Sequence, residues 1–467
     1  MDQSFLSASA ERQSHIPFPA TGSYPARNGN LLLPLVDGAA AFRRICDAME
    51  TARHSIWLTL TFVAPDFQMP DGRGSLFDVL DGAVKRGLDV RVIFWRPNPE
   101  SAGYGQAFPG SPAERDMLRR RGSRFRASWD RAHGAYCHHQ KSWLIDAGRA
   151  SETAFIGGIN PTFRAGDSVP GHRGDDQRHD IYVEITGPSA CDVHHNFVQR
   201  WNGASERMAE DGTWGHNGAG DDLAFPTRPS PARGASLVQI QRTVHAGTYR
   251  DGHPAPQDQP YDIAGGERSV LEQYLLAIDA ARRSIYIENQ AAPTPAVALR
   301  LEAALKRGVY VVALVPAEPE EYVRRARRDP PSKDFFDRLA ALGGYESFAL
   351  VGIAGRNARA SRSNIYVHGK IMLIDDAWAT IGSCNLHSFS LYGNTEMNAS
   401  FWDLTLVRAL RCELLAEHLD KDTSHLDDRA ALALYRQIAR ENRVKWDSGD
   451  WAWQGLAFSL DPSTYAK

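Results

Sequence analysis

Apolar residues along this chain follow two spacings, one typical of helices and one typical of buried strands. The helical patterns AFRRICDAMETARH and SVLEQYLLAIDAARR each precede a short apolar run, SIWLTLT from Ser55 and SIYIENQ from Ser284. A second helical pattern then ends in Lys-Arg-Gly, at Lys85–Gly87 and at Lys306–Gly308, and another apolar run follows. Short apolar runs between helices indicate a parallel sheet covered by helices on both faces.

The same order of patterns occurs twice, which indicates a duplicated fold. The two first runs begin 229 residues apart, at Ser55 and Ser284. We therefore expect an α/β fold made of two similar α/β/α sandwich halves with mostly parallel sheets, related by pseudo-two-fold symmetry. A length of 467 residues, with 43% hydrophobic and 23% charged residues, suits two globular halves.

The expected boundaries follow from local composition. Residues 204–235 are rich in Gly, Pro, Asp and Ser and are predicted to be a linker. The first half then spans residues 31–203 after an N-terminal extension of residues 1–30. The second half spans residues 236–467 and ends in a Trp-rich tail.

The spacing His-x-Lys-x4-Asp occurs once in each half, in HHQKSWLID and in VHGKIMLID. Its members are His139, Lys141 and Asp146 in the first half and His368, Lys370 and Asp375 in the second. Residues two apart in a strand face the same side, so the His and the Lys of each motif are expected to enter one pocket together. Each Asp ends its strand and is expected to have a supporting role, either pairing with a basic group or capping a turn.

The segments after the motifs also correspond. FIGGIN and TIGSCN provide Gly157, Gly158 and Asn160 in the first half and Gly382, Ser383 and Asn385 in the second. Glycines let the backbone approach a phosphate closely, and an Asn amide donates a hydrogen bond to a phosphate oxygen. We expect both segments to bind substrate oxygens.

Two acidic residues precede the next strands at matching places, Asp180 in HDIYVEI and Glu396 in TEMNASF. A carboxylate beside a histidine fixes its tautomer and stabilises its charged form. Asp180 and Glu396 are the predicted partners of the two motif histidines, grouped by half: the first set is His139, Lys141, Asn160 and Asp180, and the second is His368, Lys370, Asn385 and Glu396. The alternative is a surface charge at the start of a strand.

The residue types in this site can cleave a phosphodiester without a metal or any other cofactor, because two histidines and two lysines supply a nucleophile, an acid and cations. The five cysteines form no CxxC pair, so neither a disulfide framework nor a zinc site is expected. A net charge of −3 argues against a nucleic-acid partner.

No apolar stretch approaches the length of a transmembrane helix, which needs about 18 residues. The N-terminus lacks the basic and apolar regions of a signal peptide. The expected protein is a monomer that is either cytoplasmic or exported without a classical signal peptide. A substrate in a membrane would be met from the aqueous side.

The double motif resembles the phospholipase D superfamily, whose members carry two such motifs on a duplicated α/β fold. The segment IYIENQ, Ile285–Gln290, is similar to one typical of true phospholipases D. It ends in Glu288, Asn289 and Gln290, and the carboxyl end of such a strand is where ligand clefts lie. The alternative is a polar strand end that neighbouring loops satisfy.

The resemblance implies a phospholipase D that acts on a phospholipid at the membrane surface and releases phosphatidic acid and a head-group alcohol through a phosphohistidine. It also implies that His139 is the nucleophile and that His368 is the acid, a choice that the symmetric sequence leaves open. The lysines and asparagines would hold the phosphate oxygens. Other outcomes are transfer to an alcohol by a soluble phosphatidyltransferase of the cardiolipin-synthase type, a nuclease, or a non-catalytic head-group binder.

The two halves differ in one loop and in one strand end. Asn160 and Asp180 are 20 residues apart, whereas Asn385 and Glu396 are 11 apart. The additional segment at residues 165–178 is expected to form a lid or rim loop. SIWLTLT in the first half has no carboxylate where IYIENQ has one, so we expect one half to receive the lipid.

Overall fold

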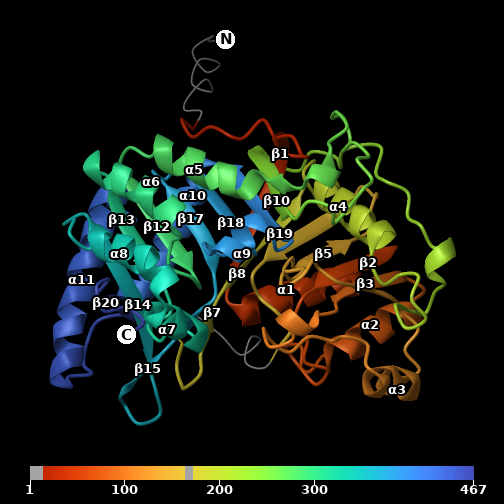
Figure 1. The fold of residues 1–467 in the computed structure, drawn as a ribbon, viewed down its shortest axis with the longest axis horizontal. Helices are drawn as coiled ribbons and strands as arrows, with labels where there is room; N and C mark the ends of the chain where they lie inside the picture. Colours follow the sequence, from red (N-terminus) through yellow and green to blue (C-terminus); the bar gives the residue numbers. More distant parts are fainter. Residues whose placement is uncertain (1–13, 163–171) are drawn as a thin grey trace, which may run out of the picture.

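The computed structural model describes residues 14–162 and 172–467, which form two α/β halves side by side (Figure 1). The elements of the first half are β1 (Arg27–Val36), α1 (Gly38–Thr51), β2 (Ser55–Leu60), α2 (Leu76–Lys85), β3 (Asp89–Trp95), α3 (Pro112–Arg121), β4 (Arg126–Asp130), β5 (Ser142–Ile145), β6 (Thr153–Gly157), β7 (Arg178–His179), β8 (Ile181–Thr186), α4 (Ala190–Gly203) and β9 (Thr213–Trp214). The elements of the second half are β10 (Ser236–Val244), β11 (Glu267–Arg268), α5 (Ser269–Ala280), β12 (Ser284–Asn289), α6 (Pro295–Lys306), β13 (Tyr310–Leu314), α7 (Glu321–Arg328), α8 (Lys333–Leu342), β14 (Phe348–Arg356), β15 (Arg362–Asn364), β16 (Tyr366–Val367), β17 (Lys370–Ile374), β18 (Trp378–Gly382), α9 (Ser388–Tyr392), β19 (Glu396–Trp402), α10 (Leu404–Leu419), α11 (Asp428–Ser448) and β20 (Ala457–Leu460).

The strands of the two halves occur in corresponding orders. In the first half the order is β4-β3-β2-β5-β6-β8-β1, and in the second it is β14-β13-β12-β17-β18-β19-β10. Strands β1 and β10 then pair with each other, so a single 18-stranded sheet runs through both halves. The prediction of two similar α/β halves is confirmed.

The sheet is mixed. The three strands β2, β3 and β4 are parallel, as are β12, β13 and β14, and the strands flanking them are antiparallel. The reason lies in the connections after the motifs. Only residues 375–377 join β17 to β18, and a parallel connection needs about a dozen residues or more, so these strands form a hairpin. The expected parallel arrangement therefore holds for β2–β4 and for β12–β14, which lie away from the junction of β1 and β10.

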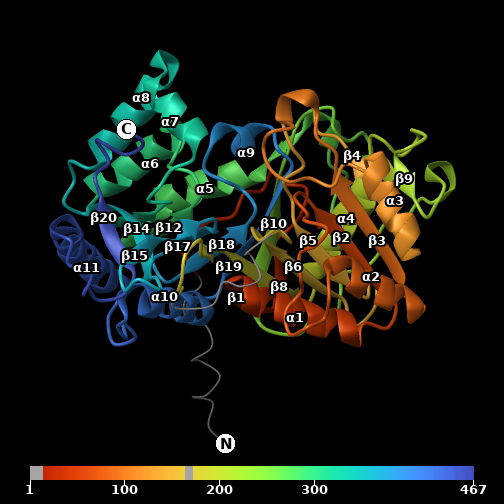
Figure 2. The ribbon, with the colours of Figure 1, turned by 90° about the horizontal axis from the view of Figure 1, so that it is seen from below.

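Helices cover both faces of the sheet, and their apolar faces form the cores (Figure 2). Helices α1 and α2 pack on one face in the first half, and α5, α6 and α8 do so in the second. Helices α4, α10 and α11 share one further core with residues from the strands of both halves. This shared core holds the halves together by removing apolar surface from water.

The predicted linker, residues 204–235, is packed against the first half. Strand β9 lies within it and pairs with β4. Asp221 Oδ2 accepts a hydrogen bond of 2.7 Å from Arg91 Nη1 on β3. The linker boundaries remain a prediction. In the C-terminal tail, the Trp453 ring is 3% exposed and lies beneath the Arg362 guanidinium, 4.8 Å away.

Among the residues that the structure describes, no helix combines the length and the apolar character needed to cross a membrane.

The motif aspartates hold the loop before each central strand. Asp375 has a φ of 58°, and its side chain accepts hydrogen bonds of 2.7, 2.8 and 2.8 Å from the backbone of Arg282, Arg283 and Ser284. Asp146 has a φ of 54°, and its side chain accepts hydrogen bonds from the backbone N–H groups of Arg53, His54 and Ser55. A positive φ is tolerated best by Gly, Asn and Asp, which explains why a short polar residue ends each motif strand.

This geometry predicts that Asp375→Ala destabilises the fold. The substitution removes the acceptor for three backbone N–H groups and places Ala at a positive φ. We expect the free energy of unfolding to fall by about 2–4 kcal/mol, measured by urea denaturation.

Two control variants separate the causes. Asp375→Asn keeps an acceptor oxygen and tolerates a positive φ, so its loss should be smaller. Asp334→Ala removes only an exposed ion pair with Arg338 and should cost less than about 1 kcal/mol. Equal losses in all three variants would contradict the capping role.

Candidate active site

The first motif histidine contacts a carboxylate of the second half. His139 lies just before β5, and its Nδ1 is 3.0 Å from Glu396 Oε2 at the start of β19. The same nitrogen is 3.1 Å from the backbone oxygen of Ser383. Both neighbours are acceptors, so Nδ1 carries the proton and Nε2 carries the lone pair in the neutral ring.

The second motif histidine has the reciprocal contact. His368 lies just before β17, and its Nδ1 is 2.5 Å from Asp180 Oδ2, between β7 and β8 of the first half. Backbone contacts support the crossing, since the His368 N–H donates to the His179 oxygen at 2.8 Å, and the His139 N–H donates to the Thr395 oxygen at 2.9 Å. Each half thus provides the carboxylate for the histidine of the other, and the predicted grouping of each acid with the histidine of its own half is wrong.

The two carboxylates have different surroundings. Glu396 accepts hydrogen bonds of 2.6 Å from both the Ser383 and the Ser390 hydroxyls. Burial alone would raise the pKa of Glu396, but His139, Lys141 and the Ser383 hydroxyl outweigh burial and hold the pKa below its usual value. Glu396 is therefore ionised at neutral pH.

Asp180 makes fewer contacts. Besides His368, its side chain accepts one hydrogen bond of 2.8 Å, from the backbone N–H of Ile181. Burial raises the pKa of Asp180 to about 7, with Lys370 opposing the shift. The two histidine–carboxylate pairs are equivalent in sequence but unequal in structure.

Both motif histidines are buried and still reachable, with exposed fractions of 7% for His139 and 8% for His368. Burial lowers the pKa of His139, and Lys141 adds to the effect, although Glu396 opposes it. Burial lowers the pKa of His368 well below its usual value, and the charge of Lys370 lowers it further. The free site therefore holds uncharged imidazoles at neutral pH.

The two motif lysines are fully buried. Lys141 Nζ donates to the backbone oxygen of His139 at 2.7 Å, and Lys370 Nζ donates to that of His368. Burial lowers the pKa of Lys141 to about 7 and that of Lys370 to about 8. The charge of Lys370 lowers the pKa of Lys141 further. The carboxylates of Glu396 and Asp180 raise the pKa of both lysines, so the two motifs share one electrostatic environment.

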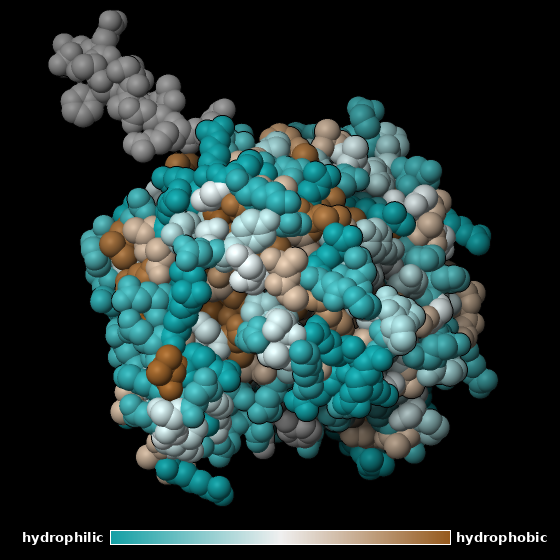
Figure 3. Space-filling model, turned by 60° about the vertical axis from the view of Figure 1, so that its left-hand side comes forward, coloured by the Kyte–Doolittle hydropathy of each residue, from teal (hydrophilic) through white to brown (hydrophobic). Residues whose placement is uncertain are grey.

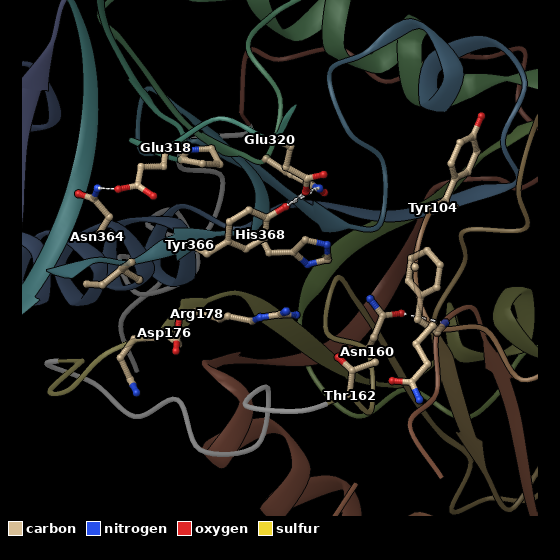
Figure 4. A pocket seen from close by; sticks show the side chains of 17 residues that line it. Tyr104, Asn160, Thr162, Asp176, Arg178, Glu318, Glu320, Asn364, Tyr366 and His368 are labelled. Carbon is tan, nitrogen blue, oxygen red and sulfur yellow. Dashed lines mark hydrogen bonds between the residues drawn. The ribbon is translucent and has the colours of Figure 1, made fainter. Parts of the chain in front are cut away.

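A pocket of about 830 Å³ opens beside His368 (Figure 4). The side chains of His368 and Arg178 extend towards the side on which Asn160 lies, and Tyr366 points to Glu320. The outer face of the molecule seen in Figure 3 is predominantly hydrophilic. A pocket of this volume suits a small-molecule head group attached to a phosphate.

The predicted amides lie at this pocket or next to it. Asn160 lines the pocket and accepts a hydrogen bond of 3.3 Å from the Phe62 N–H through Oδ1, which leaves its Nδ2 donor facing away from that contact. Asn385 Nδ2 and Lys370 Nζ both lie 3.3 Å from the side-chain oxygen of Gln290. Gln290 itself lines the pocket. The structure thus brings Asn160, Asn385 and Gln290 near the histidines and lysines.

Comparison with known proteins agrees with this arrangement. Residues 274–417 match a family model described as "Cardiolipin synthase, PLD-like domain", and residues 170–292 match one described as "Phospholipase D". The chain belongs to the phospholipase D superfamily.

Curated relatives of this superfamily member carry two kinds of name. The chain is 23% identical to phospholipase D A of Dictyostelium discoideum over 82% of its own length. It is 25% identical to phospholipase D alpha 2 of Oryza sativa over 75% of its own length. The alignments cover 34% and 58% of those two proteins. The chain is also 22% identical to the probable cardiolipin synthase YwiE of Bacillus subtilis. This alignment covers 86% of the chain and 68% of the Bacillus protein.

The fold has a solved counterpart. A phosphatidylserine synthase from Haemophilus influenzae superposes on 92% of the chain and 96% of its own length, with a TM-score of 0.53 and 13% sequence identity. At 13% sequence identity, this similarity shows a shared fold alone. The superfamily assignment and the duplicated α/β halves therefore agree with each other.

The three predicted phosphate-binding glycines make room for neighbouring side chains and strands. A Cβ on Gly158 would lie 2.3 Å from Asp180 Oδ1, and one on Gly382 would lie 2.1 Å from Asn398 Oδ1. A Cβ on Gly157 would lie 2.3 Å from the backbone oxygen of Ile181. The structure thus gives these glycines a packing reason that the turn pattern did not reveal. Ser383 is fully buried and orients Glu396 and His139.

Two polar residues of the segment Ile285–Gln290 lie behind the pocket. Glu288 is fully buried, and its Oε2 is 2.9 Å from His179 Nε2. Asn289 Oδ1 accepts hydrogen bonds from the backbone N–H groups of Leu386 at 3.1 Å and Ala291 at 3.0 Å. Of the three predicted polar residues, Gln290 is the one that lines the pocket.

Several site residues escaped the sequence analysis. Ser390 and Asn394 bind Glu396, and Arg178, Tyr366 and Glu320 line the pocket. Arg178 directly precedes the HD pair of the first half, and this adjacency is a usable signal. The others lie in segments without a repeat. Half of the predicted lid or rim loop at 165–178, residues 165–171, lies outside the described residues.

The lysine pKa values predict pH-dependent binding of a phosphodiester anion. Dimethyl phosphate keeps its single negative charge between pH 6 and pH 9, whereas Lys141 and Lys370 lose their charge as pH rises through about 7 and 8. We expect binding to weaken by about tenfold over this range, measured calorimetrically, because a charged hydrogen bond contributes about 1.5 kcal/mol or more.

Lys370→Met is the matched variant, since it keeps the length of the side chain without the charge. It should bind weakly at all pH values and show a smaller dependence on pH. An affinity that stays constant between pH 6 and pH 9 in the unsubstituted protein would contradict the role of the lysines.

Proposed function

We propose that this protein is a phospholipase D, which hydrolyses the distal phosphodiester bond of glycerophospholipids to phosphatidic acid and a free head-group alcohol. The observation that carries the proposal is the exchange of carboxylates between the halves, which orients two imidazoles beside one pocket. His139 contacts Glu396, His368 contacts Asp180, and His368 lines the pocket. These groups supply a nucleophile and an acid, as phosphodiester cleavage requires.

In the first step, Nε2 of His139 attacks phosphorus and the bond from phosphorus to the head-group oxygen breaks. His368 gives the proton of its Nε2 to that oxygen, so the alcohol leaves uncharged. Its Nδ1 takes a proton from Asp180, whose raised pKa of about 7 lets it carry one, and this proton returns to Asp180 in the second step. The firm ionisation of Glu396 favours this direction, because it keeps the proton of His139 on Nδ1 and the lone pair on Nε2. The place of His368 in the pocket wall puts it beside the leaving group.

In the second step, His368 takes a proton from water, and the water oxygen attacks phosphorus. The bond from phosphorus to His139 breaks, which releases phosphatidic acid and restores the enzyme. Lys141, Lys370, Asn160 and Asn385 hold the non-bridging oxygens in both steps. Buried cations are effective there because the surroundings screen their charge poorly.

The charges around the pocket favour a lipid head group over a nucleic acid. Glu318, Glu320 and Asp176 line the pocket together with Arg178. A nucleic-acid groove would be lined by basic side chains that follow several phosphates. Three carboxylates at the mouth would repel such a polyanion.

Phosphatidyl transfer to an alcohol is the second candidate. The match of residues 274–417 to the cardiolipin synthase description and the similarity to the Bacillus subtilis protein favour it. The phosphohistidine would be the same, and a second alcohol would replace water in the second step.

A product assay tests the proposal. The purified full-length chain should release choline and phosphatidic acid from phosphatidylcholine vesicles, and added ethanol or glycerol should divert part of the product to a transfer product. Transfer without hydrolysis would favour the second candidate. Cleavage of single-stranded DNA with no turnover of any phospholipid would overturn both.

The division of roles between the histidines predicts a trapped adduct. In His368→Ala, an aryl phosphodiester lipid whose leaving group needs no acid should phosphorylate His139, and hydrolysis of the adduct should stall. Turnover of phosphatidylcholine should fall by about 10²–10⁴-fold, the usual contribution of a general acid or base. Mass spectrometry of proteolytic fragments locates the adduct.

His139→Ala is the reciprocal variant and should form no adduct. An adduct on His368 in His139→Ala would reverse the two roles. An adduct in neither variant, with turnover intact in the unsubstituted protein, would exclude the covalent route.

A further inference from the structure

A second group of titratable side chains lies behind the active-site pocket. It consists of Asp37 at the start of α1, His172, His179 on β7, and Glu417 on α10. One ligand-type atom from each of the four lies within 4.8 Å of those of the others. His172 Nε2 is 3.1 Å from Asp37 Oδ2 and 3.3 Å from Glu417 Oε1, and His179 Nδ1 is 3.1 Å from Asp37 Oδ1.

These distances suit ligands around one metal ion. Bonds of about 2.0–2.1 Å in tetrahedral geometry place ligand atoms roughly 3.3 Å apart. Two histidine nitrogens and two carboxylates are ligands that zinc and other first-row divalent metals accept. The phosphate-binding residues of the pocket are not part of this group.

The hydrogen bonding of His172 is a separate observation that points to a ligand. The His172 ring is fully buried, and its Nε2 faces two carboxylate oxygens, those of Asp37 and Glu417, while its Nδ1 makes no hydrogen bond to any residue that the structure describes. A single nitrogen can give one proton to these two acceptors, whereas a metal ion could bind both carboxylates and the imidazole at once.

The backbone at two of the four residues is also unusual. Asp37 has a φ of 66° and His172 has a φ of 36°, both in the left-handed region. Such conformations cost of order 1–3 kcal/mol and persist where the surroundings fix them. In both cases the side chain is aimed at the same buried site.

A second layer of residues holds His179 in the orientation that a ligand needs. Its Nε2 is 2.9 Å from Glu288 Oε2, while Tyr286 donates to Glu288 Oε1 at 2.7 Å. Metal-bound histidines regularly donate their other ring N–H to a carboxylate, which fixes the tautomer. His179 is thus poised to use Nδ1 as the ligand atom.

We propose that Asp37, His172, His179 and Glu417 bind one structural divalent transition-metal ion, of which zinc is the best fit. The ion would link the first half to α10 of the second half. It would also brace the active site from behind, because the His179 oxygen accepts from the His368 N–H at 2.8 Å and the Asp180 oxygen accepts from the Asp37 N–H at 2.8 Å. The ion touches no substrate and takes part in no step of the proposed reaction.

The competing description of the same residues is a proton-bound cluster. In it, a protonated His179 would sit between Asp37 and Glu288, from which it lies 3.1 and 2.9 Å away. In that arrangement His172 Nε2 would share one proton between Asp37 and Glu417, and its Nδ1 would have no partner among the described residues. Metal content distinguishes the two descriptions.

The test uses the full-length chain, purified without a metal-affinity tag or chelator from zinc-supplemented medium. Elemental analysis should find about one equivalent of zinc per chain. Removal of the ion under mild denaturation followed by cobalt should give the visible ligand-field absorption of a site with nitrogen and oxygen ligands. A chain that holds less than about a tenth of an equivalent, and that takes up neither zinc nor cobalt, overturns the proposal.

Variants locate the ion. His172→Ala and Asp37→Asn should each lose most of the metal and lower the thermal midpoint. His194→Gln is the matched control, because His194 is a buried histidine whose Nδ1 lies 2.9 Å from Glu152 but which lies outside the cluster. It should keep the metal. Retention of a full equivalent in His172→Ala and Asp37→Asn would place the ion elsewhere and overturn the assignment.

The outcome is independent of the proposed reaction. His139→Ala should keep the metal while losing phospholipid turnover. A protein that turns over phospholipid but never binds metal would disprove the metal site alone. A protein that holds the ion but cleaves no phosphodiester would disprove the proposed function alone.

Discussion

The exchange of carboxylates between the halves is the contact on which the site depends. His139 faces Glu396 of the second half, and His368 faces Asp180 of the first. Neither half by itself contains a complete histidine–carboxylate pair, so the position of one half relative to the other must be fixed. Three contacts fix it: the pairing of β1 with β10, the parallel pairing of β7 with β16, and a hydrophobic core formed by residues of both halves. The large shared sheet is thus a condition for the chemistry.

The sequence predicts what is local and periodic. The spacing of His, Lys and Asp in two equivalent strands was enough to locate both motifs, and Asp146 and Asp375 cap turns because a short polar side chain suits a positive φ. It also predicted that acids would accompany the histidines. Their crossing was out of reach, because nothing in the spacing of one strand says which half presents Asp180 to which histidine. The glycine roles were equally hidden, since Gly158 is explained by an atom of Asp180 and not by its own neighbours in sequence.

Duplication does not make the two sites equal. Glu396 receives two short hydrogen bonds from Ser383 and Ser390, whereas Asp180 receives one from its neighbouring backbone. The number of donors to a carboxylate sets how firmly it is ionised, and so how firmly it fixes its histidine. Ser383 has no counterpart in the first half, where Gly158 stands at its place. A small change in one repeat is therefore sufficient to give the two motifs different surroundings.

The buried lysines explain why this site favours an anion. Lys141 and Lys370 are fully buried, and among the described residues Lys141 donates one hydrogen bond, to the oxygen of His139. An ammonium group has three donors, so the folded protein retains hydrogen-bonding capacity that it does not use itself. Burial of such a cation is unfavourable, which is the reason for its lowered pKa. A phosphodiester oxygen supplies both the missing acceptor and the missing negative charge. Binding of the anion therefore offsets the free-energy cost of burying the two lysines. For this reason we expect the burial of the lysines to strengthen the binding of a phosphodiester.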